Sequence, residues 1–192
     1  MKINISSIFS GIYSEIKKMK LYKIYNYASK DLPIAVWPVW KAGSNRLHRH
    51  DCFELAFVTH GSGLCRINDM PYPVLRGDVY VMNLEDTHSY EMEPNCRFYN
   101  ILFRKKLFGN DKVLHELFEE WESKSGKKLY QLDDEDIESS DKSFSLITDE
   151  LRQRKKGYEL AIRAFFAGFL IKLIRSGDRD NHIRVENLFH QE

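Results

Sequence analysis

The chain has 192 residues, of which 43% are hydrophobic and 13% aromatic, so it can form a sizeable core and is neither disordered nor fibrous. Its 29 Lys and Arg residues against 28 Asp and Glu residues leave a formal charge of +1, which excludes the basic surplus typical of a nucleic-acid-binding segment. The three cysteines form no C-x-x-C pair, and the chain shows neither a secretory signal nor a membrane-spanning stretch, so we expect a protein of the reducing cytoplasm.

The first half of the chain, residues 1–106, predicts an arm followed by a β unit. Residues 1–31 have weak helical spacing of isoleucines and predict an N-terminal arm or short helix. Over residues 32–106, short apolar runs alternate with turn residues such as Asn68-Asp69 and Gly61-Ser62-Gly63. This spacing predicts an antiparallel all-β sandwich or barrel.

Residues 107–177 have helical spacing and predict helices at 112–122, 143–156 and 158–175, with a solvated polar connection at 123–141. The last of these helices is apolar on more than one face, so it must be buried on several sides. A second copy of the chain is one source of that cover, and its own barrel and sister helix are another. Residues 178–192 are polar and predict a linker.

A group of potential metal ligands lies in the β unit. His48, His50 and Glu54 all have even numbers, so on an extended strand their side chains would project to one side. With His88 they form a plausible ligand set for a divalent ion such as Zn, Ni, Fe or Mn. The alternative is a polar wall in which Glu54 accepts hydrogen bonds. Cys52 shares the even-numbered register and would face the same cavity or be a small buried residue.

The stretch GSNRLHRHDCFELAFVTHG from Gly43 to Gly61 resembles the first signature of the cupins, and Gly77 and His88 stand where the second signature expects them. The resemblance implies a mainly β fold with C-terminal helices, in which a cupin-like antiparallel β-barrel, or jelly roll, precedes a helical pair. It also implies that the His and Glu residues lie inside the barrel.

Within the cupins, the phrases HRHDCFEL, LRGDVYVMN and THSY are similar to the effector-binding and dimerisation domain of bacterial regulators of the arabinose and rhamnose operon type, the AraC family. The resemblance covers residues 37–174. It implies that 32–106 is the effector-binding barrel, that 107–177 is a helical dimerisation region, and that 178–192 leads toward a DNA-binding helix-turn-helix domain absent from this chain.

The same resemblance suggests where an effector and a second subunit would bind. Tyr90 and Asn100 match positions that line the barrel of sugar-binding members, and they are flanked by Tyr99. Trp37 and Trp40 are candidates for an aromatic platform, although only one of them can face inward on a regular strand. The residues expected to form a homodimer contact are in the last helix, at Phe165, Phe166, Phe169 and Leu173.

Three functions are consistent with these features. The first is a sensor in which a small effector, most plausibly a carbohydrate, enters the barrel and shifts the arm or the dimer contact, with no catalytic step. The second is a small cupin metalloenzyme of the dioxygenase or isomerase type. The third is a dimerisation module with an empty barrel. The helical pair favours the sensor, because a small cupin enzyme does not need it.

Overall fold

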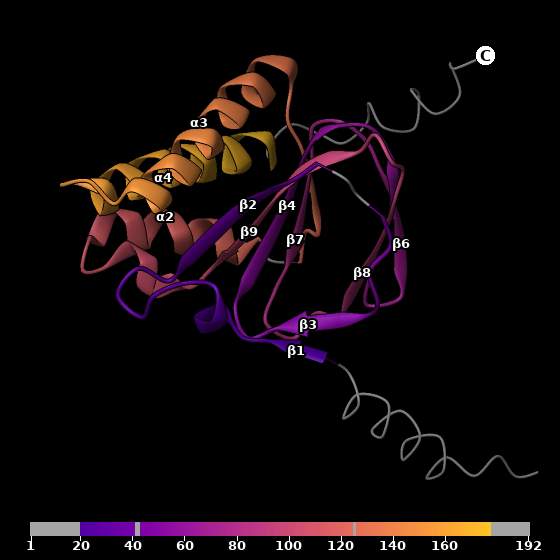
Figure 1. The fold of residues 1–192 in the computed structure, drawn as a ribbon, viewed down its shortest axis with the longest axis horizontal. Coiled ribbons are helices and arrows are strands. Elements are labelled where there is room, and N and C mark those ends of the chain that lie inside the picture. The colour runs from indigo at the N-terminus through magenta and orange to yellow at the C-terminus, as the bar shows by residue number, and fades with distance from the viewer. Residues whose placement is uncertain (1–19, 41–42, 125, 178–192) are drawn as a thin grey trace, which may run out of the picture.

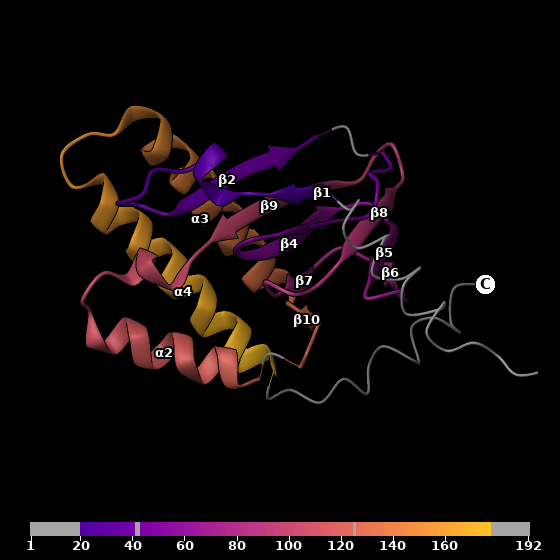
Figure 2. The same ribbon diagram turned by 90° about the horizontal axis from the view of Figure 1, so that it is seen from below.

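The fold consists of two facing β-sheets with helices packed on the outer side of one of them (Figures 1 and 2). The computed structural model describes residues 20–40, 43–124 and 126–177. The expected linker at 178–192, and most of the expected N-terminal arm, therefore lie outside the described residues. The predicted order of a β unit followed by helices is confirmed.

Each sheet has five strands, and all neighbouring strands are antiparallel except one pair. The first sheet contains, in spatial order, β1 (Lys20–Tyr22), β3 (His48–His50), β8 (His88–Met92), β5 (Gly63–Ile67) and β6 (Met70–Val74). The second contains β10 (Leu129–Gln131), β7 (Asp78–Met82), β4 (Phe53–His60), β9 (Arg97–Phe103) and β2 (Ile34–Val39). The exception is β1, which pairs with β3 in parallel. This two-sheet arrangement is consistent with the predicted jelly roll.

Alternation of side chains along the second sheet separates an inner face from an outer face. On β4, the even-numbered Ala56 and Val58 pack against Tyr90 and Cys65 of the first sheet, which fills the space between the sheets. The odd-numbered residues of β4 and β9 point the other way, toward the helices. The parity of a residue on these strands therefore decides whether it can line an interior cavity.

Three α-helices follow the strands: α2 (Lys112–Ser123), α3 (Asp134–Gln153) and α4 (Tyr158–Gly177). Two short 3-10 helices occur at η1 (Ile24–Asn26) and η2 (Lys105–Phe108). Among the described helices, none has the length and hydropathy needed to cross a membrane. The predicted connection at 123–141 is partly wrong, because β10 lies within it and α3 begins well before residue 143. The Asp133 side chain accepts a hydrogen bond from the Asp136 amide, which starts α3 at its acidic stretch.

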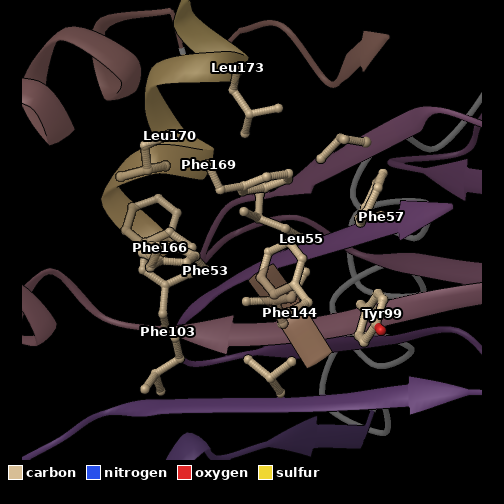
Figure 3. Close-up of a cluster of buried hydrophobic side chains, with 14 of the residues drawn as sticks. Phe53, Leu55, Phe57, Tyr99, Phe103, Phe144, Phe166, Phe169, Leu170 and Leu173 are labelled. Atoms are coloured by element: carbon tan, nitrogen blue, oxygen red, sulfur yellow. The ribbon is translucent and has the colours of Figure 1, made fainter. Parts of the chain in front are cut away.

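Helix α4 provides the cover of the outer sheet face (Figure 3). Phe166 packs 4.7 Å from Phe103 of β9, and Phe169 lies 5.7 Å from Phe57 of β4 and 4.7 Å from Phe144 of α3, measured between ring centroids. These side chains are buried within one chain, as is Leu173, and the half-buried Phe165 packs against the same core. The chain's own sheet and sister helix therefore cover Phe166, Phe169 and Leu173, which were expected to contact a second copy, whereas Phe165 stays partly exposed.

The described part of the arm, residues 20–31, contains a strand and a 3-10 turn, and the isoleucines whose spacing suggested a short helix lie outside the described residues. Asp51 anchors this segment through two hydrogen bonds. Its side chain accepts a hydrogen bond from the Ile24 amide at 2.8 Å, and its own amide donates to the Tyr22 carbonyl. Arg104 forms an ion pair with the same carboxylate at 2.6 Å. The segment is thereby fixed beside β3, which carries two of the candidate metal ligands.

Candidate functional site

The four candidate ligands come from three strands in two sheets. His48 and His50 are on β3 and His88 is on β8, both in the first sheet, whereas Glu54 is on the inner face of β4 in the second sheet. The expectation that His48, His50 and Glu54 share one extended strand is wrong, because the chain turns after β3 and Glu54 lies on β4 in the other sheet. They still converge, since the two sheets face one another and His48 is directly opposite His88 in the β3–β8 pair.

The ligand atoms of these residues lie within 4.8 Å of one another, and all four side chains are buried. The Nε2 atoms of His50 and His88 lie 2.7 and 2.9 Å from the same carboxylate oxygen, Glu54 Oε2. Ligands that share one zinc-type ion are about 4 Å apart or less, so the cluster is close to the size of a metal site.

The orientation of these groups also fits a metal. Apart from these two short contacts, His50 Nε2, His88 Nε2 and Glu54 Oε2 have no hydrogen-bond partner within the described residues. Buried polar atoms are seldom left in this way. His48 Nδ1–H donates to the Arg46 carbonyl at 2.8 Å, which leaves its Nε2 lone pair available. An ion at the centre of the cluster would give these atoms a partner.

The electrostatic environment favours a neutral His48 and an ionised Glu54. Burial, reinforced by the neighbouring His88, lowers the pKa of His48 to about 4, so its imidazole is neutral at physiological pH. Burial alone would raise the pKa of Glu54, but His88 and His50 outweigh it and lower that pKa below its usual range. A neutral imidazole and an ionised carboxylate are the forms that bind divalent ions.

Two tyrosines contact the cluster. The Tyr90 hydroxyl donates to Glu54 Oε1 at 3.3 Å, which leaves the other carboxylate oxygen to the histidines. Burial raises the pKa of Tyr90 well above its ordinary value, so it acts as a neutral donor. Tyr22 of β1 packs against two of the histidines, with its ring centroid 5.0 Å from that of His48 and 5.5 Å from that of His50.

A cavity of ≈ 580 Å³ opens beside His48 and His50. Trp37 and Asn100 lie opposite each other in the β2–β9 pair and both line it. The Oδ1 atom of Asn100 is buried and has no hydrogen-bond partner within the described residues, so it can accept a bond from a ligand. The cavity has the size of an ordinary small-molecule site. Its lining consists of Lys20, Tyr22, Tyr27, Trp37, Asn45, Arg46, Leu47, His48, His50 and Asn100.

Four residues expected near an effector do not line this cavity: Tyr90, whose hydroxyl binds Glu54, and Tyr99, Trp40 and Cys52. Tyr99 has odd parity on β9, so it points toward the helices, where its hydroxyl donates to the Asp141 carbonyl (Figure 3). Trp40 lies beyond the end of β2, is 59% exposed and has the Arg97 guanidinium 5.9 Å from its ring. Cys52 is buried at the turn between β3 and β4, where it packs in a small apolar cluster, and burial raises its pKa to about 12.

The structure brings His48, His50, Glu54 and His88 together and places Asn100 in the lining of the adjacent cavity, but part of the cavity wall was not predicted from the sequence. Tyr22 and Lys20 were not recognised, because their place depends on a parallel pairing over a long sequence separation that no local pattern indicates. Of the two tryptophans considered for an aromatic platform, Trp37 lines the cavity, where it is paired with Asn100 across neighbouring strands.

Comparison with known proteins gives matches of three kinds. Residues 39–170 match the family model described as AraC-like ligand binding domain. The transcriptional activator RhaS of Escherichia fergusonii is 31% identical over 85 residues, which cover 44% of this chain and 31% of that protein. The activator RhaR of Shigella dysenteriae is 33% identical over 88 residues, covering 46% and 31%. The chain thus spans about a third of the length of these relatives.

Among solved structures, a cupin-2 domain containing protein from Shewanella frigidimarina aligns with 22% identity and a TM-score of 0.33. The alignment covers 40% of this chain and 74% of that one. A likeness of this size carries no argument about function.

Proposed function

The chain belongs to the family of AraC-like ligand binding domains, and from that membership we propose that it is the effector-sensing unit of a cytoplasmic bacterial transcription regulator. A small carbohydrate binds in the cavity and shifts the balance between two states of the regulator, without a catalytic step. The observation that carries the proposal is the buried cluster of His48, His50, Glu54 and His88 directly beside a cavity with an unpaired acceptor on Asn100.

The chemistry of the wall supports a ligand with hydroxyl groups. A buried acceptor without a partner is unfavourable, and a ligand hydroxyl that donates to Asn100 Oδ1 removes that penalty. The rings of Trp37 and Tyr27, 5.6 Å apart, offer flat apolar surfaces for the carbon-bound faces of a sugar ring. The curated relatives are named as transcriptional activators, and in this proposal DNA recognition belongs to a separate helix-turn-helix domain of the full regulator.

A divalent ion is part of the proposal as an organising group for the cavity floor. His48, His50, Glu54 and His88 would hold it, and the ions consistent with three imidazoles and one carboxylate are Zn, Ni, Fe and Mn. When bound, it would supply a Lewis-acidic site for an oxygen of the effector. Tyr90 would keep Glu54 oriented through its hydroxyl.

Metal binding is tested by elemental analysis of protein that has been loaded with each ion and then dialysed. We expect about one equivalent in the parent chain and its loss in the double variant His48→Ala/His50→Ala. The matched control is His60→Ala, because that imidazole is exposed at the end of β4 and outside the cluster. Equal metal content in all three proteins would rule out the cluster as the site.

Effector binding is tested by a thermal-shift screen over neutral sugars, since a ligand that binds only the folded state raises the apparent melting temperature. The shift should disappear in Asn100→Ala and persist in Trp40→Ala, whose side chain is exposed outside the cavity. A shift that survives Asn100→Ala would put the effector elsewhere.

A cupin metalloenzyme of the dioxygenase or isomerase type is the second candidate, because the cluster lies where a cavity ligand would reach a bound ion. Prolonged incubation of metal-loaded protein with the ligand found in the screen separates the two. Recovery of unchanged ligand by NMR supports the sensor, and turnover to a product supports the enzyme.

Homodimerisation is also part of the proposal. It is assigned to the outer faces of α3 and α4, where Leu146 and Leu160 are exposed apolar side chains. A dimer there would connect the state of the sensor to the spacing of two DNA-binding domains.

A further inference from the structure

The lining of the cavity is unusual in its charge. Lys20 and Arg46 both contribute to it, whereas no Asp or Glu is among the described residues that line it. The Glu54 carboxylate is not part of this lining and already lies against His50 and His88. A ligand in this cavity therefore meets two cations with no anion to balance them.

Neither cation has an ionic partner of its own. Within the described part of the chain, no ion pair involves Lys20 or Arg46, whereas nearby Arg104 is paired with Asp51. Lys20 Nζ lies 4.3 Å from the centre of the Tyr22 ring, a position that keeps the ammonium group beside the cavity.

The two cations belong to the same part of the wall. Lys20 is paired with His48 in the register of β1 and β3. Arg46 lies two residues before His48, in the segment that leads into β3. Lys20 and Arg46 therefore lie at the edge of the cavity that His48 lines, while Asn100 and Trp37 line the cavity from the other sheet. One edge of the cavity suits an anion, and the other suits a hydroxylated ring.

We propose that the effector is an acidic sugar, that is, a hydroxylated carboxylate of monosaccharide size. Its carboxylate lies at the edge with Lys20 and Arg46, and one of its hydroxyls donates to Asn100 Oδ1. Charge-assisted bonds to Lys and Arg are stronger than bonds between neutral groups, and Arg matches the planar carboxylate. The inference rests on the proposed function and narrows its ligand from carbohydrates in general to sugar acids.

The test is isothermal titration of the 192-residue chain with D-glucuronate and D-galacturonate, and with their neutral parents D-glucose and D-galactose, at one ionic strength. Glucose 6-phosphate is included to distinguish a carboxylate site from a general anion site. We expect a uronate to bind at least about tenfold more tightly than its parent sugar. The variant Lys20→Gln/Arg46→Gln should lose at least about tenfold for the acid and little for the neutral sugar.

The control variant is Lys112→Gln/Arg152→Gln, which removes two exposed cations from the helices and changes the net charge equally. Its uronate affinity should equal that of the parent chain. If a neutral sugar binds as tightly as its acid, the inference fails while the proposed function holds. If only the phosphate binds, the carboxylate assignment is overturned. If no probe binds, both the inference and the carbohydrate ligand of the proposed function fail.

Discussion

Replacing Phe169 by alanine tests whether α4 stabilises the fold of one chain or the contact between two. Phe169 is 2% exposed, and its ring packs against Phe57 of the sheet and Phe144 of α3. Removing a buried phenylalanine costs about 3–5 kcal/mol, a large part of the about 5–15 kcal/mol that stabilises a typical domain. For a chain of this size each kcal/mol lowers the melting temperature by about 2–4 °C, so we expect a fall of about 10 °C.

The assay combines thermal unfolding followed by circular dichroism with light scattering after size exclusion. The control is Val113→Ala on α2, whose side chain is 71% exposed, and it should change stability by about 0.5 kcal/mol at most. A Phe169→Ala protein that melts like the parent but has half its mass would refute the assignment of this residue to the core of one chain.

Three further predictions concern stability measured by urea unfolding. Burial lowers the pKa of His48 from 6.5 to about 4, so the imidazole is protonated in the unfolded chain before it is protonated in the folded one. The free energy of unfolding of metal-free protein should therefore fall by up to about 3 kcal/mol between pH 6.5 and pH 4. The variant His48→Gln should show a flatter pH profile. Gly61→Ala should lower the free energy of unfolding by about 2 kcal/mol or more, since Gly61 has φ +81° and an added Cβ would lie 2.5 Å from Cys96 Cα. Gly43→Ala is the control and should be nearly neutral, because an added Cβ there would meet no atom within 4 Å. Asp133→Ala should cost about 1 kcal/mol by removing the cap of α3; an unchanged midpoint would contradict that role.

The strands of the β unit were predictable because turn residues separate them and apolar runs fill them. The apolar run FELAFVTH forms β4 (Phe53–His60), and the run DVYVM forms β7 (Asp78–Met82). Both are buried on the inner and outer faces, which is why their apolar character is nearly continuous in the sequence.

The sequence indicated which residues form the cluster of His48, His50, Glu54 and His88, but not that these residues come from two facing sheets. Even numbering indicated a shared face for His50 and Glu54, yet the two residues face each other from different sheets across a turn. The wall of the cavity was harder to predict, because Tyr22 becomes part of it only through the parallel pairing of β1 with β3. Such pairing depends on long-range packing and leaves no periodic signal in the sequence.

The acidic segment before α3 illustrates another limit. Its polarity suggested a solvated connection, but the exposed face of a helix has the same composition, and only the cap at Asp133 distinguishes the two. The apolar α4 posed the opposite difficulty, since a helix covered by its own sheet and a helix covered by a second copy have the same sequence pattern.

The place of α4 in the chain has a consequence for synthesis on the ribosome. Phe53, Phe57 and Phe103 on the outer sheet face are made early, but Phe166 and Phe169, which cover them, follow at least sixty residues after the last of these strands begins. Until α4 leaves the exit tunnel, the nascent sheet presents an aromatic surface to its surroundings. Chaperone binding to stalled nascent chains should therefore be strongest before residue 170 emerges and should fall once the helix docks.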